Sequence, residues 1–342
     1  MSSWGTPELL LVFLVAAGAT WVAGLYLSKS VDILDVRFKL GDAVGGLLLL
    51  GLAGSLPELA ITASAAIAGN LELAVGNLLG GIAMQTLVLV LLDATSKQKK
   101  PLTSLSDLSP LFESVLVMVV LLIALMGAFL PSSTAIGSVS PASIAIVIFF
   151  VLGVFAINRG RQNPAWKLAG DPPPPPAEAP NRFKRSTTAI VLLAFGAASA
   201  VTLFAGVMLE QTGNQLADDW GINGAVFGAT ILAAVTALPE ISSGIQAVRL
   251  GDVGLAMSDI YGGNAVQLTF FLLADILAGS PVLPTAGAQS LWLGAVGAAM
   301  TGVFAYGLLL RTDRKVWLIG RDSLIVLAMY IAAVCLLPAI PS

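Results

Sequence analysis

Histidine is absent from this 342-residue sequence, and cysteine occurs once, at Cys335. Without histidine the chain lacks the side chain that usually titrates near neutral pH, so proton chemistry has to use carboxylates. A single cysteine excludes an internal disulfide and a cysteine-based metal site. Charged residues are also scarce: they make up 11% of the chain, about half of what a soluble domain carries.

Apolar residues take the place of the missing charge. They account for 57% of the chain, together with 35 glycines, and glycine is more frequent in membrane helices than in soluble ones. Because lipid accepts only structures whose backbone groups bond internally, and because the apolar runs are long and continuous, the sequence predicts a polytopic α-helical membrane protein. The N-terminus has no basic segment before its first apolar run, so we expect a retained span there rather than a cleaved signal peptide.

Ten segments are long enough to cross a bilayer, which takes about 20 apolar residues. They are roughly residues 7–28, 40–68, 72–93, 108–130, 141–158, 188–209, 222–248, 253–278, 288–310 and 322–340. All 17 lysines and arginines fall in the odd-numbered loops between these segments. The positive-inside rule then predicts that the odd loops are cytoplasmic and that both termini lie outside.

One long polar segment divides the ten spans five and five. Residues 159–187 include five consecutive prolines, Pro172 to Pro176, which favour an extended conformation over a helix. We interpret the segment as a cytoplasmic tether, with a docking site for a proline-binding partner as the alternative. The halves are then 1–158 and 188–342, and because five is an odd number they enter the membrane in opposite orientations. The fold class predicted is therefore all-α, with ten transmembrane helices in two inverted five-helix repeats.

The two halves share one segment of sequence. Residues 52–93 and 234–275 align at a constant offset of 182, and each copy contains a Leu-Pro-Glu triplet and, further on, a Gly-Gly pair and a glutamine. A repeated segment interrupted by glycine and proline in apolar surroundings is typical of the binding site of a secondary transporter.

The two glutamates of these triplets are the main candidate site residues. Glu58 and Glu240 fall near the middle of their spans, where a charged side chain costs about 2.5 to 3.5 kcal/mol to insert. Inverted symmetry should bring them face to face, and two close carboxylates cannot both stay ionised without a bound proton or cation. Other polar residues recur at helical spacing on the same segments. The candidate metal ligands are Glu58, Glu240, Ser55, Thr236, Gln85, Gln267, Asn77 and Asp259. Asp93 and Asp275, which end their spans, are expected at the two membrane interfaces instead.

These segments resemble the two α-repeats of the sodium/calcium exchangers, in the calcium/cation antiporter superfamily. The family pattern G-T-S-x-P-E followed by G-N-x-x-G-S-N corresponds to GSLPEL at 54–59 with GNLLGGI at 76–82, and to TALPEI at 236–241 with SDIYGGN at 258–264. The resemblance implies a ten-helix fold with central ion sites and alternating access, and it places the family's essential acids at Glu58 and Glu240.

The chain departs from the family pattern at several positions. The serine of G-S-N is replaced by Gly81 and Gly263, and the Asn or Asp four residues later is replaced by Gln85 and Gln267. The resemblance therefore implies calcium ligation by the two glutamates, while the missing hydroxyls put sodium coupling in question.

The sequence predicts a cation antiporter that exchanges calcium for sodium, protons or both, in a cell membrane that we expect to be a prokaryotic inner membrane. The runner-up is a sodium/proton exchanger without a calcium role, and a passive cation channel is the alternative from another class. An enzyme is not expected, because no nucleophile motif accompanies the paired acids. We expect no cofactor beyond the transported ions, no nucleic-acid partner and no obligate protein partner.

Overall fold

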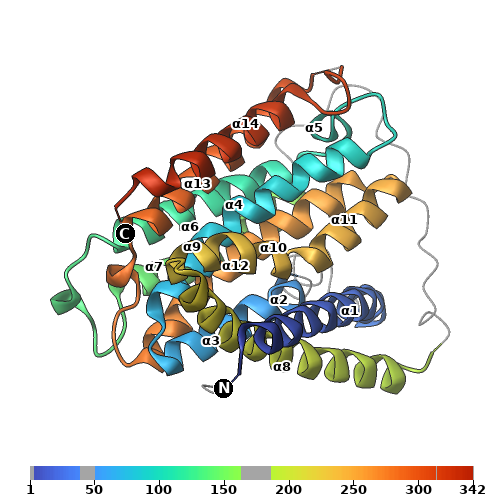
Figure 1. Cartoon of the computed structure of the whole chain (residues 1–342). Helices are drawn as coiled ribbons and strands as arrows, with labels where there is room; N and C mark the ends of the chain where they lie inside the picture. Colours follow the sequence, from blue (N-terminus) through green and yellow to red (C-terminus); the bar gives the residue numbers. More distant parts are fainter. Residues whose placement is uncertain (1–3, 39–50, 163–185, 313, 342) are drawn as a thin grey trace.

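The structure, a computed structural model, describes residues 4–38, 51–162, 186–312 and 314–341. These residues are almost entirely helical, and their only β-type pairing is in two isolated bridges, Ile136–Val139 and Val316–Ile319. The predicted all-α class is confirmed (Figure 1). The linker prediction for 159–187 falls mostly on residues outside these ranges, so the division into 1–158, 159–187 and 188–342 stays a prediction.

The helices of the first half are α1 (Thr6–Phe38), α2 (Gly51–Gly54), α3 (Leu56–Ala68), α4 (Leu71–Thr95), α5 (Leu102–Leu105), α6 (Ser109–Gly127) and α7 (Pro141–Gln162). Those of the second half are α8 (Thr188–Trp220), α9 (Gly224–Phe227), the π-helical turn η4 (Gly228–Leu232), α10 (Ala233–Thr236), α11 (Leu238–Leu250), α12 (Val253–Ala278), α13 (Ala288–Leu310) and α14 (Arg321–Leu336). Three short 3-10 turns, η2 (Ser132–Thr134), η5 (Leu283–Thr285) and η6 (Leu337–Ala339), lie between or after these helices.

The second half repeats the helices of the first. Helices α1 and α8 both have 33 residues, and α8 begins 182 positions after α1. Helices α3 and α11 both have 13 residues and begin with Leu-Pro-Glu, again 182 positions apart. The offset read from the sequence therefore holds for the bounds of whole helices as well as for the motifs.

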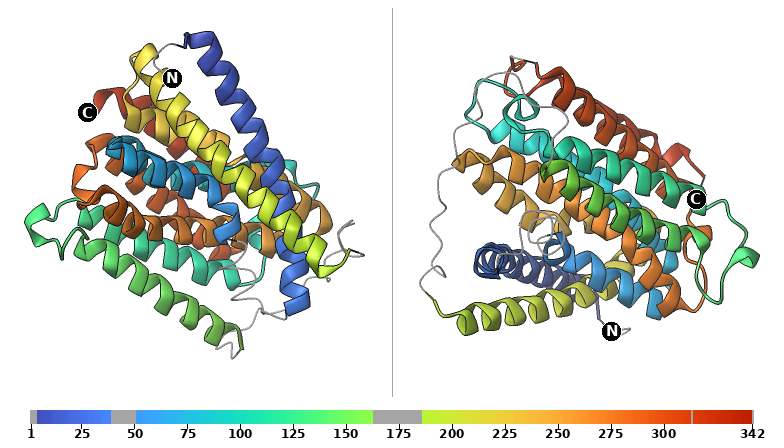
Figure 2. Two further views of the ribbon diagram at one scale, coloured as in Figure 1. Left: turned by 90° about the horizontal axis from the view of Figure 1, so that it is seen from below. Right: turned by 180° about the vertical axis from the view of Figure 1, so that it is seen from behind.

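The broken helices occupy the centre of the molecule. Helix α3 packs against both α4 and α12, and α11 packs against both α12 and α4, so each half contacts the other through its motif helices. Helices α1 and α8 lie along each other on one side, and α6, α7, α13 and α14 cover the other (Figures 1 and 2). A helix of 33 residues is about 50 Å long, so α1 and α8 have to tilt in a bilayer with a core of about 30 Å.

Two glycines allow α4 to approach the second broken segment closely. A Cβ on Gly76 or Gly80 would overlap Ala225 or Ala229, which lie in α9 and η4. Only residues without a Cβ permit backbones to come this near, which explains why η4 lies directly against α4.

The described ranges contain eight or nine candidate membrane spans. In the described ranges eight helices are long and apolar enough to cross a membrane, or up to nine when the bent pair Gly224–Thr236 and Leu238–Leu250 counts as one span. The predicted span 40–68 includes residues 40–50, which lie outside the described ranges. The count of ten membrane spans therefore stays a prediction. The predicted span 188–209 is longer in the structure, because α8 continues to Trp220.

Candidate ion-binding site

Each half contains a helix that is interrupted one residue before a Leu-Pro-Glu triplet. Helix α2 ends at Gly54 and α3 begins at Leu56, while α10 ends at Thr236 and α11 begins at Leu238. Proline in the first turn of each second segment lacks the N–H that would continue the ladder, so a carbonyl of the preceding turn loses its helical partner. Glu58 and Glu240 both lie in the first turn after the break, where free carbonyls and a carboxylate come close together.

Glu58 is buried in the centre of the protein. Its side chain is 1% exposed, and its Oε1 accepts a hydrogen bond of 3.0 Å from Nε2 of Gln85. The hydroxyl of Thr236, from the opposite half, lies next to this carboxylate. The other oxygen, Oε2, has no hydrogen-bond partner in the described chain. A carboxylate buried with one oxygen unsatisfied costs free energy that a bound cation or proton can recover.

Glu240 lies close enough to Glu58 for the two charges to repel each other, as the sequence predicted, and Asp259 adds further repulsion. Glu240 is 6% exposed, and its Oε2 also has no partner within the described residues. Asp259 accepts a hydrogen bond of 3.1 Å from Oγ of Ser243. Glu240 of α11 thus lies near one acid of α3 and one of α12, and this local negative charge favours a cation.

The two glutamines of the motif cross between the halves. Gln267 donates from Nε2 to the carbonyl of Leu78 over 2.9 Å, and an ideal Cβ on Gly81 would lie only 2.7 Å from that nitrogen. The amide of Gln267 therefore fills the space next to Gly81. In the mirrored position, an ideal Cβ on Gly263 would lie 3.9 Å from Oε1 of Gln85.

This geometry explains two departures from the exchanger pattern together. A glutamine is longer than the Asn or Asp that the resemblance implies, and at Gly81 the glycine opposite makes room for it. Oε1 of Gln267 is buried and has no hydrogen-bond partner among the described residues.

The remaining predicted ligands lie around the same centre. Ser55 Oγ is 3.4 Å from the carbonyl oxygen of Gly263, to which it donates, and Thr236 donates to the carbonyl of Ala233. Asn77 is fully buried, with neither amide atom hydrogen-bonded in the part of the chain that is described. These oxygens make the cluster rich in neutral ligands, which hard cations such as calcium accept together with carboxylates. No group of three or more acids arranged for a metal occurs among the described residues, so calcium here would depend on two glutamates and neutral oxygens.

Asp259 lines a small hollow that adjoins the cluster. It has a volume of ≈ 80 Å³ and lies between the end of α1 and helices α11 and α12. Ser243, which bonds Asp259, lines it as well, and so does Lys29. The hollow is therefore a mainly apolar recess whose lining includes the polar side chains of Asp259, Ser243 and Lys29.

The sequence did not single out Asn264 as a site residue. Its side chain is 0% exposed, and neither amide atom has a hydrogen-bond partner among the described residues. It is the last residue of the SDIYGGN motif, one position beyond Gly263, and that place in the motif was the available signal. The sequence also missed Glu210 of α8, which accepts hydrogen bonds from Ser64 Oγ and Asn70 Nδ2 over 2.8 and 2.9 Å. Glu210 thus connects α8 to α3 through Ser64 and to the turn between α3 and α4 through Asn70. These bonds hold α3, the helix that carries Glu58, in position.

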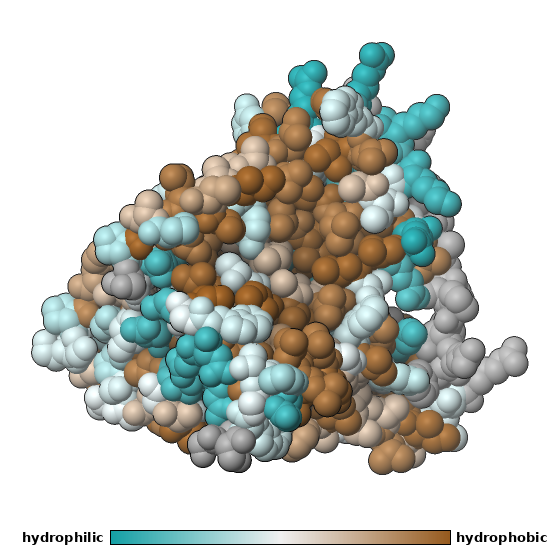
Figure 3. Space-filling model, in the orientation of Figure 1, coloured by the Kyte–Doolittle hydropathy of each residue, from teal (hydrophilic) through white to brown (hydrophobic). Residues whose placement is uncertain are grey.

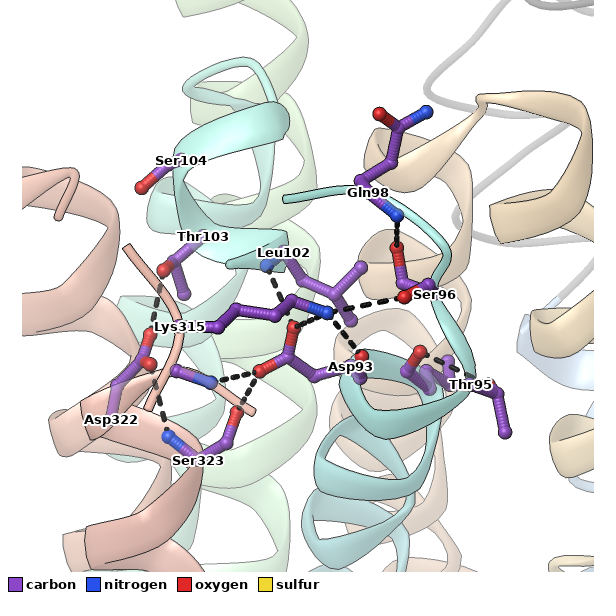
Figure 4. A network of polar contacts seen from close by, with 12 residues as sticks. Asp93, Thr95, Ser96, Gln98, Leu102, Thr103, Ser104, Lys315, Asp322 and Ser323 are labelled. Carbon is purple, nitrogen blue, oxygen red and sulfur yellow. Dashed lines mark hydrogen bonds and ion pairs between the residues drawn. The ribbon is translucent and has the colours of Figure 1, made fainter. Parts of the chain in front are cut away.

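Asp93 and Asp275 lie near the ends of α4 and α12, and their side chains are buried in the protein. Asp93 at the end of α4 accepts hydrogen bonds from Gly320 N over 2.6 Å and Ser323 Oγ over 2.7 Å, and it pairs with Lys315 (Figure 4). Asp275 at the end of α12 accepts one from Ser140 N over 2.9 Å. Helix α4 is thus bonded to the start of α14, and helix α12 is bonded to the residue just before α7. Each of the two helices therefore contacts the beginning of the last helix of the other half. The expectation that these acids sit at the ends of their helices is correct, but their side chains face inward.

Helical spans, two structural repeats and buried carboxylates on paired broken helices together define a secondary transporter. The family described as "Sodium/calcium exchanger protein" matches residues 8–157 and 188–337. The chain belongs to this family, as the motif resemblance implied. It is thus a cation exchanger of this membrane-transporter family.

Two curated relatives align with most of the chain. It is 28% identical to "Putative antiporter CaxA" of Alkalimonas amylolytica over 284 residues, which are 81% of this chain and 78% of that one. It is 24% identical to "Inner membrane protein YrbG" of Escherichia coli (strain K12) over 258 residues, 75% of this chain and 74% of the relative.

Solved structures share the fold. The crystal structure of the H+/Ca2+ exchanger CAX superposes with a TM-score of 0.72 at 16% identity, over 96% of this chain and 82% of that one. The sodium-calcium exchanger NCX_Mj superposes with a TM-score of 0.63 at 17% identity, over 97% and 99%. At these identities the likeness supports the fold alone.

Proposed function

We propose that the protein exchanges calcium for sodium or protons across a cell membrane by alternating access. The observation that carries the proposal is the convergence of Glu58 and Glu240 from the two halves, each with one carboxylate oxygen lacking a partner in the described residues. A divalent cation neutralises both charges at once, and calcium tolerates the mixed, flexible set of six to eight oxygens that such a site offers. The proposed ligands are those predicted from the sequence: Glu58, Glu240, Ser55, Thr236, Gln85, Gln267, Asn77 and Asp259.

The proposed orientation follows from charge. Basic residues of the loops after α4 and α13 line one hollow: Lys97, Lys99, Arg314 and Lys315. Lys315 pairs there with Asp93 at the end of α4 (Figure 4). By the positive-inside rule the face with this hollow is cytoplasmic, both termini are outside, and the linker 159–187 is cytoplasmic. The hollow beside Asp259 contains Lys29 of α1, one of the basic residues that this rule assigns to the cytoplasmic side, so we propose that the hollow opens toward the cytoplasm.

The coupling ion is the second part of the proposal. Gly81 and Gly263 replace serine hydroxyls that would help to complete sodium sites, whereas a proton needs a single carboxylate. A buried carboxylate beside another acid takes up a proton more readily than an isolated one. We therefore propose that protons substitute for at least one sodium ion, with Glu58 and Glu240 titrating as a coupled pair.

We predict that an imposed pH gradient alone drives calcium uptake into inside-out vesicles that contain the protein. Lowering the pH equally on both sides should suppress uptake, because protons then occupy the carboxylates that bind calcium. The measurement is calcium accumulation under a pH gradient, under a sodium gradient and under neither. Strict dependence on sodium without any response to a pH gradient would contradict proton coupling. Equal flux under all conditions would favour a passive channel, and gradient-driven sodium/proton exchange that calcium does not affect would favour the runner-up function.

We also predict that Gln85→Leu and Gln267→Leu each weaken calcium binding about threefold to tenfold. Each change removes an amide oxygen from the cluster, and a neutral ligand contributes about 1 kcal/mol. Half-saturation concentrations of calcium in vesicle transport provide the measurement, with Gln98→Leu as a matched control because Gln98 is exposed in the loop after α4. An unchanged half-saturation concentration in both site variants would mean that the glutamines only pack.

A further inference from the structure

A deep apolar groove runs along the outside of the molecule between α4, α11 and α14. Its volume is ≈ 730 Å³, which is within the range of sites that bind organic molecules. Leu87 and Leu91 of α4, Ile241 of α11 and Leu327 of α14 contribute to its walls. Figure 3 shows brown, hydrophobic side chains gathered over this part of the molecule, with hydrophilic side chains projecting at its upper right edge.

A second hollow lies at the end of this apolar groove and is basic. It has a volume of ≈ 460 Å³ and contains Lys97, Lys99, Arg314 and Lys315. The two segments that form it, residues 96–101 and 311–320, hold six lysines and arginines and one acid, Asp313, whose placement lies outside the described ranges. Lys315 points inward to Asp93, while Lys97, Lys99 and Arg314 are exposed.

The apolar groove and the basic hollow are continuous, because Trp317 and Leu318 line both. Trp317 is 97% exposed and occupies the tight turn closed by the Val316–Ile319 bridge. Its backbone has φ 62°, in the left-handed region, where a bulky side chain costs about 1–2 kcal/mol.

The matching turn of the first half contains no such side chain. The Ile136–Val139 bridge closes it in the same way, and Gly137 takes the left-handed position with φ 66°, at no steric cost. The chain thus keeps an exposed indole at a strained position on the basic face and a glycine on the opposite face. Backbone strain alone favours glycine in both turns. The exposed tryptophan at the strained position therefore indicates a ligand that contacts its indole at the rim of the groove.

We propose that the apolar groove and the basic hollow together bind one anionic glycerophospholipid. An acyl chain lies in the groove, the phosphate lies among Lys97, Lys99 and Arg314, and Trp317 packs at the level of the glycerol backbone. Charge complementarity selects this occupant: basic pockets at the cytoplasmic ends of transmembrane helices bind acidic head groups, and tryptophan favours the interface between head groups and hydrocarbon.

The position of the site connects it to the centre of the protein. Ile241 in the groove wall follows Glu240 directly, and Met84, which also lines the groove, precedes Gln85. An acyl chain would therefore pack against the two helices that hold the candidate ligands. Lipid binding itself is independent of the exchange reaction, and its test does not use transport.

The test is native mass spectrometry of the purified full-length chain, titrated with phosphatidylglycerol, with phosphatidylcholine and with glycerol phosphate. We expect one phosphatidylglycerol per chain and a preference of about tenfold or more over phosphatidylcholine. The variant Lys97→Gln/Arg314→Gln should lose about thirtyfold in phosphatidylglycerol affinity, since each of the two basic residues near the surface contributes about 1 kcal/mol. The matched control Arg159→Gln/Arg249→Gln removes the same charge outside the groove and the hollow and should bind like the wild type.

Trp317→Gly separates lipid binding from stability. Glycine relieves the left-handed backbone, so the thermal midpoint should stay equal or rise, while phosphatidylglycerol affinity should fall severalfold. Equal losses in the two double variants, or no preference between the two lipids, would overturn the proposal. So would glycerol phosphate binding as tightly as the lipid, or a second copy of the chain occupying the groove as a dimer. If Trp317→Gly fails to fold, the comparison of the charge variants still decides.

Discussion

Replacing either Glu58 or Glu240 by glutamine is expected to abolish calcium exchange while the folded protein remains in the membrane. Each variant keeps the shape of the side chain but removes one of the two charges that would neutralise the ion. Removing one partner of a buried charge pair costs about 3 kcal/mol or more, so apparent calcium affinity should fall at least about a hundredfold.

The stability of the ion-free protein should not fall in the same two variants. Glu58 and Glu240 repel each other in the buried cluster, so a neutral amide at either position removes that repulsion, and the thermal midpoint without calcium should be unchanged or higher. Measuring calcium flux and thermal unfolding on the same preparations separates loss of the site from loss of the fold.

Glu72→Gln is the matched control for this prediction. Glu72 lies in the first turn of α4 and is exposed, so its neutralisation should leave calcium flux at the wild-type level. Wild-type flux in Glu58→Gln or Glu240→Gln at matched expression would contradict the site assignment, as would an equal loss in Glu72→Gln.

The second large effect concerns the two glycines that replace the family's serines. Gly81→Ser should reduce calcium affinity about tenfold, because an ideal Cβ there lies 2.7 Å from Nε2 of Gln267. The Gln267 amide then has to move from its hydrogen bond to Leu78, and overpacking of this kind costs about 1–3 kcal/mol. Gly263→Ser should be close to neutral, because the nearest atom to its ideal Cβ is Ser55 Oγ at 3.7 Å.

A double variant provides the control for this prediction. Gly81→Ser/Gln267→Asn shortens the opposing side chain and restores the pairing of residue types that the exchanger resemblance implies, so it should recover most of the lost affinity. Half-saturation concentrations for the wild type, Gly81→Ser, Gln267→Asn and the double variant complete a double-mutant cycle. Equal effects of serine at the two glycines, or no recovery in the double variant, would contradict the claim that Gln267 fills the space left by the missing side chain of Gly81.

The fold was predictable because its main signals are local. Apolar segments of membrane-spanning length are read directly from composition, and the offset of 182 relates helices α1 and α8 as well as α3 and α11. The breaks before Glu58 and Glu240 follow from a proline in each Leu-Pro-Glu triplet. The approach of the two glutamates followed from symmetry, and the structure brings them together.

Contacts between the halves were not predictable in the same way. Gln267 fills the space at Gly81, and Asp93 accepts from Gly320 N and Ser323 Oγ, yet these partners are far apart in sequence. A single sequence carries no signal for such contacts, because hydrophobic periodicity describes each helix by itself. For the same reason the sequence did not predict that the side chains of Asp93 and Asp275 are buried. A carboxylate that accepts hydrogen bonds from backbone N–H groups can be buried at the end of a helix, since those bonds replace its hydration.

A structure determined with calcium bound tests the central claim most directly. The account predicts one calcium ion between Glu58 and Glu240, ligated by a carboxylate oxygen from each and by oxygens of the Gln85 and Gln267 amides or of the broken helices. Calcium bound elsewhere at saturating concentration, with both glutamates outside its coordination sphere, would contradict the account.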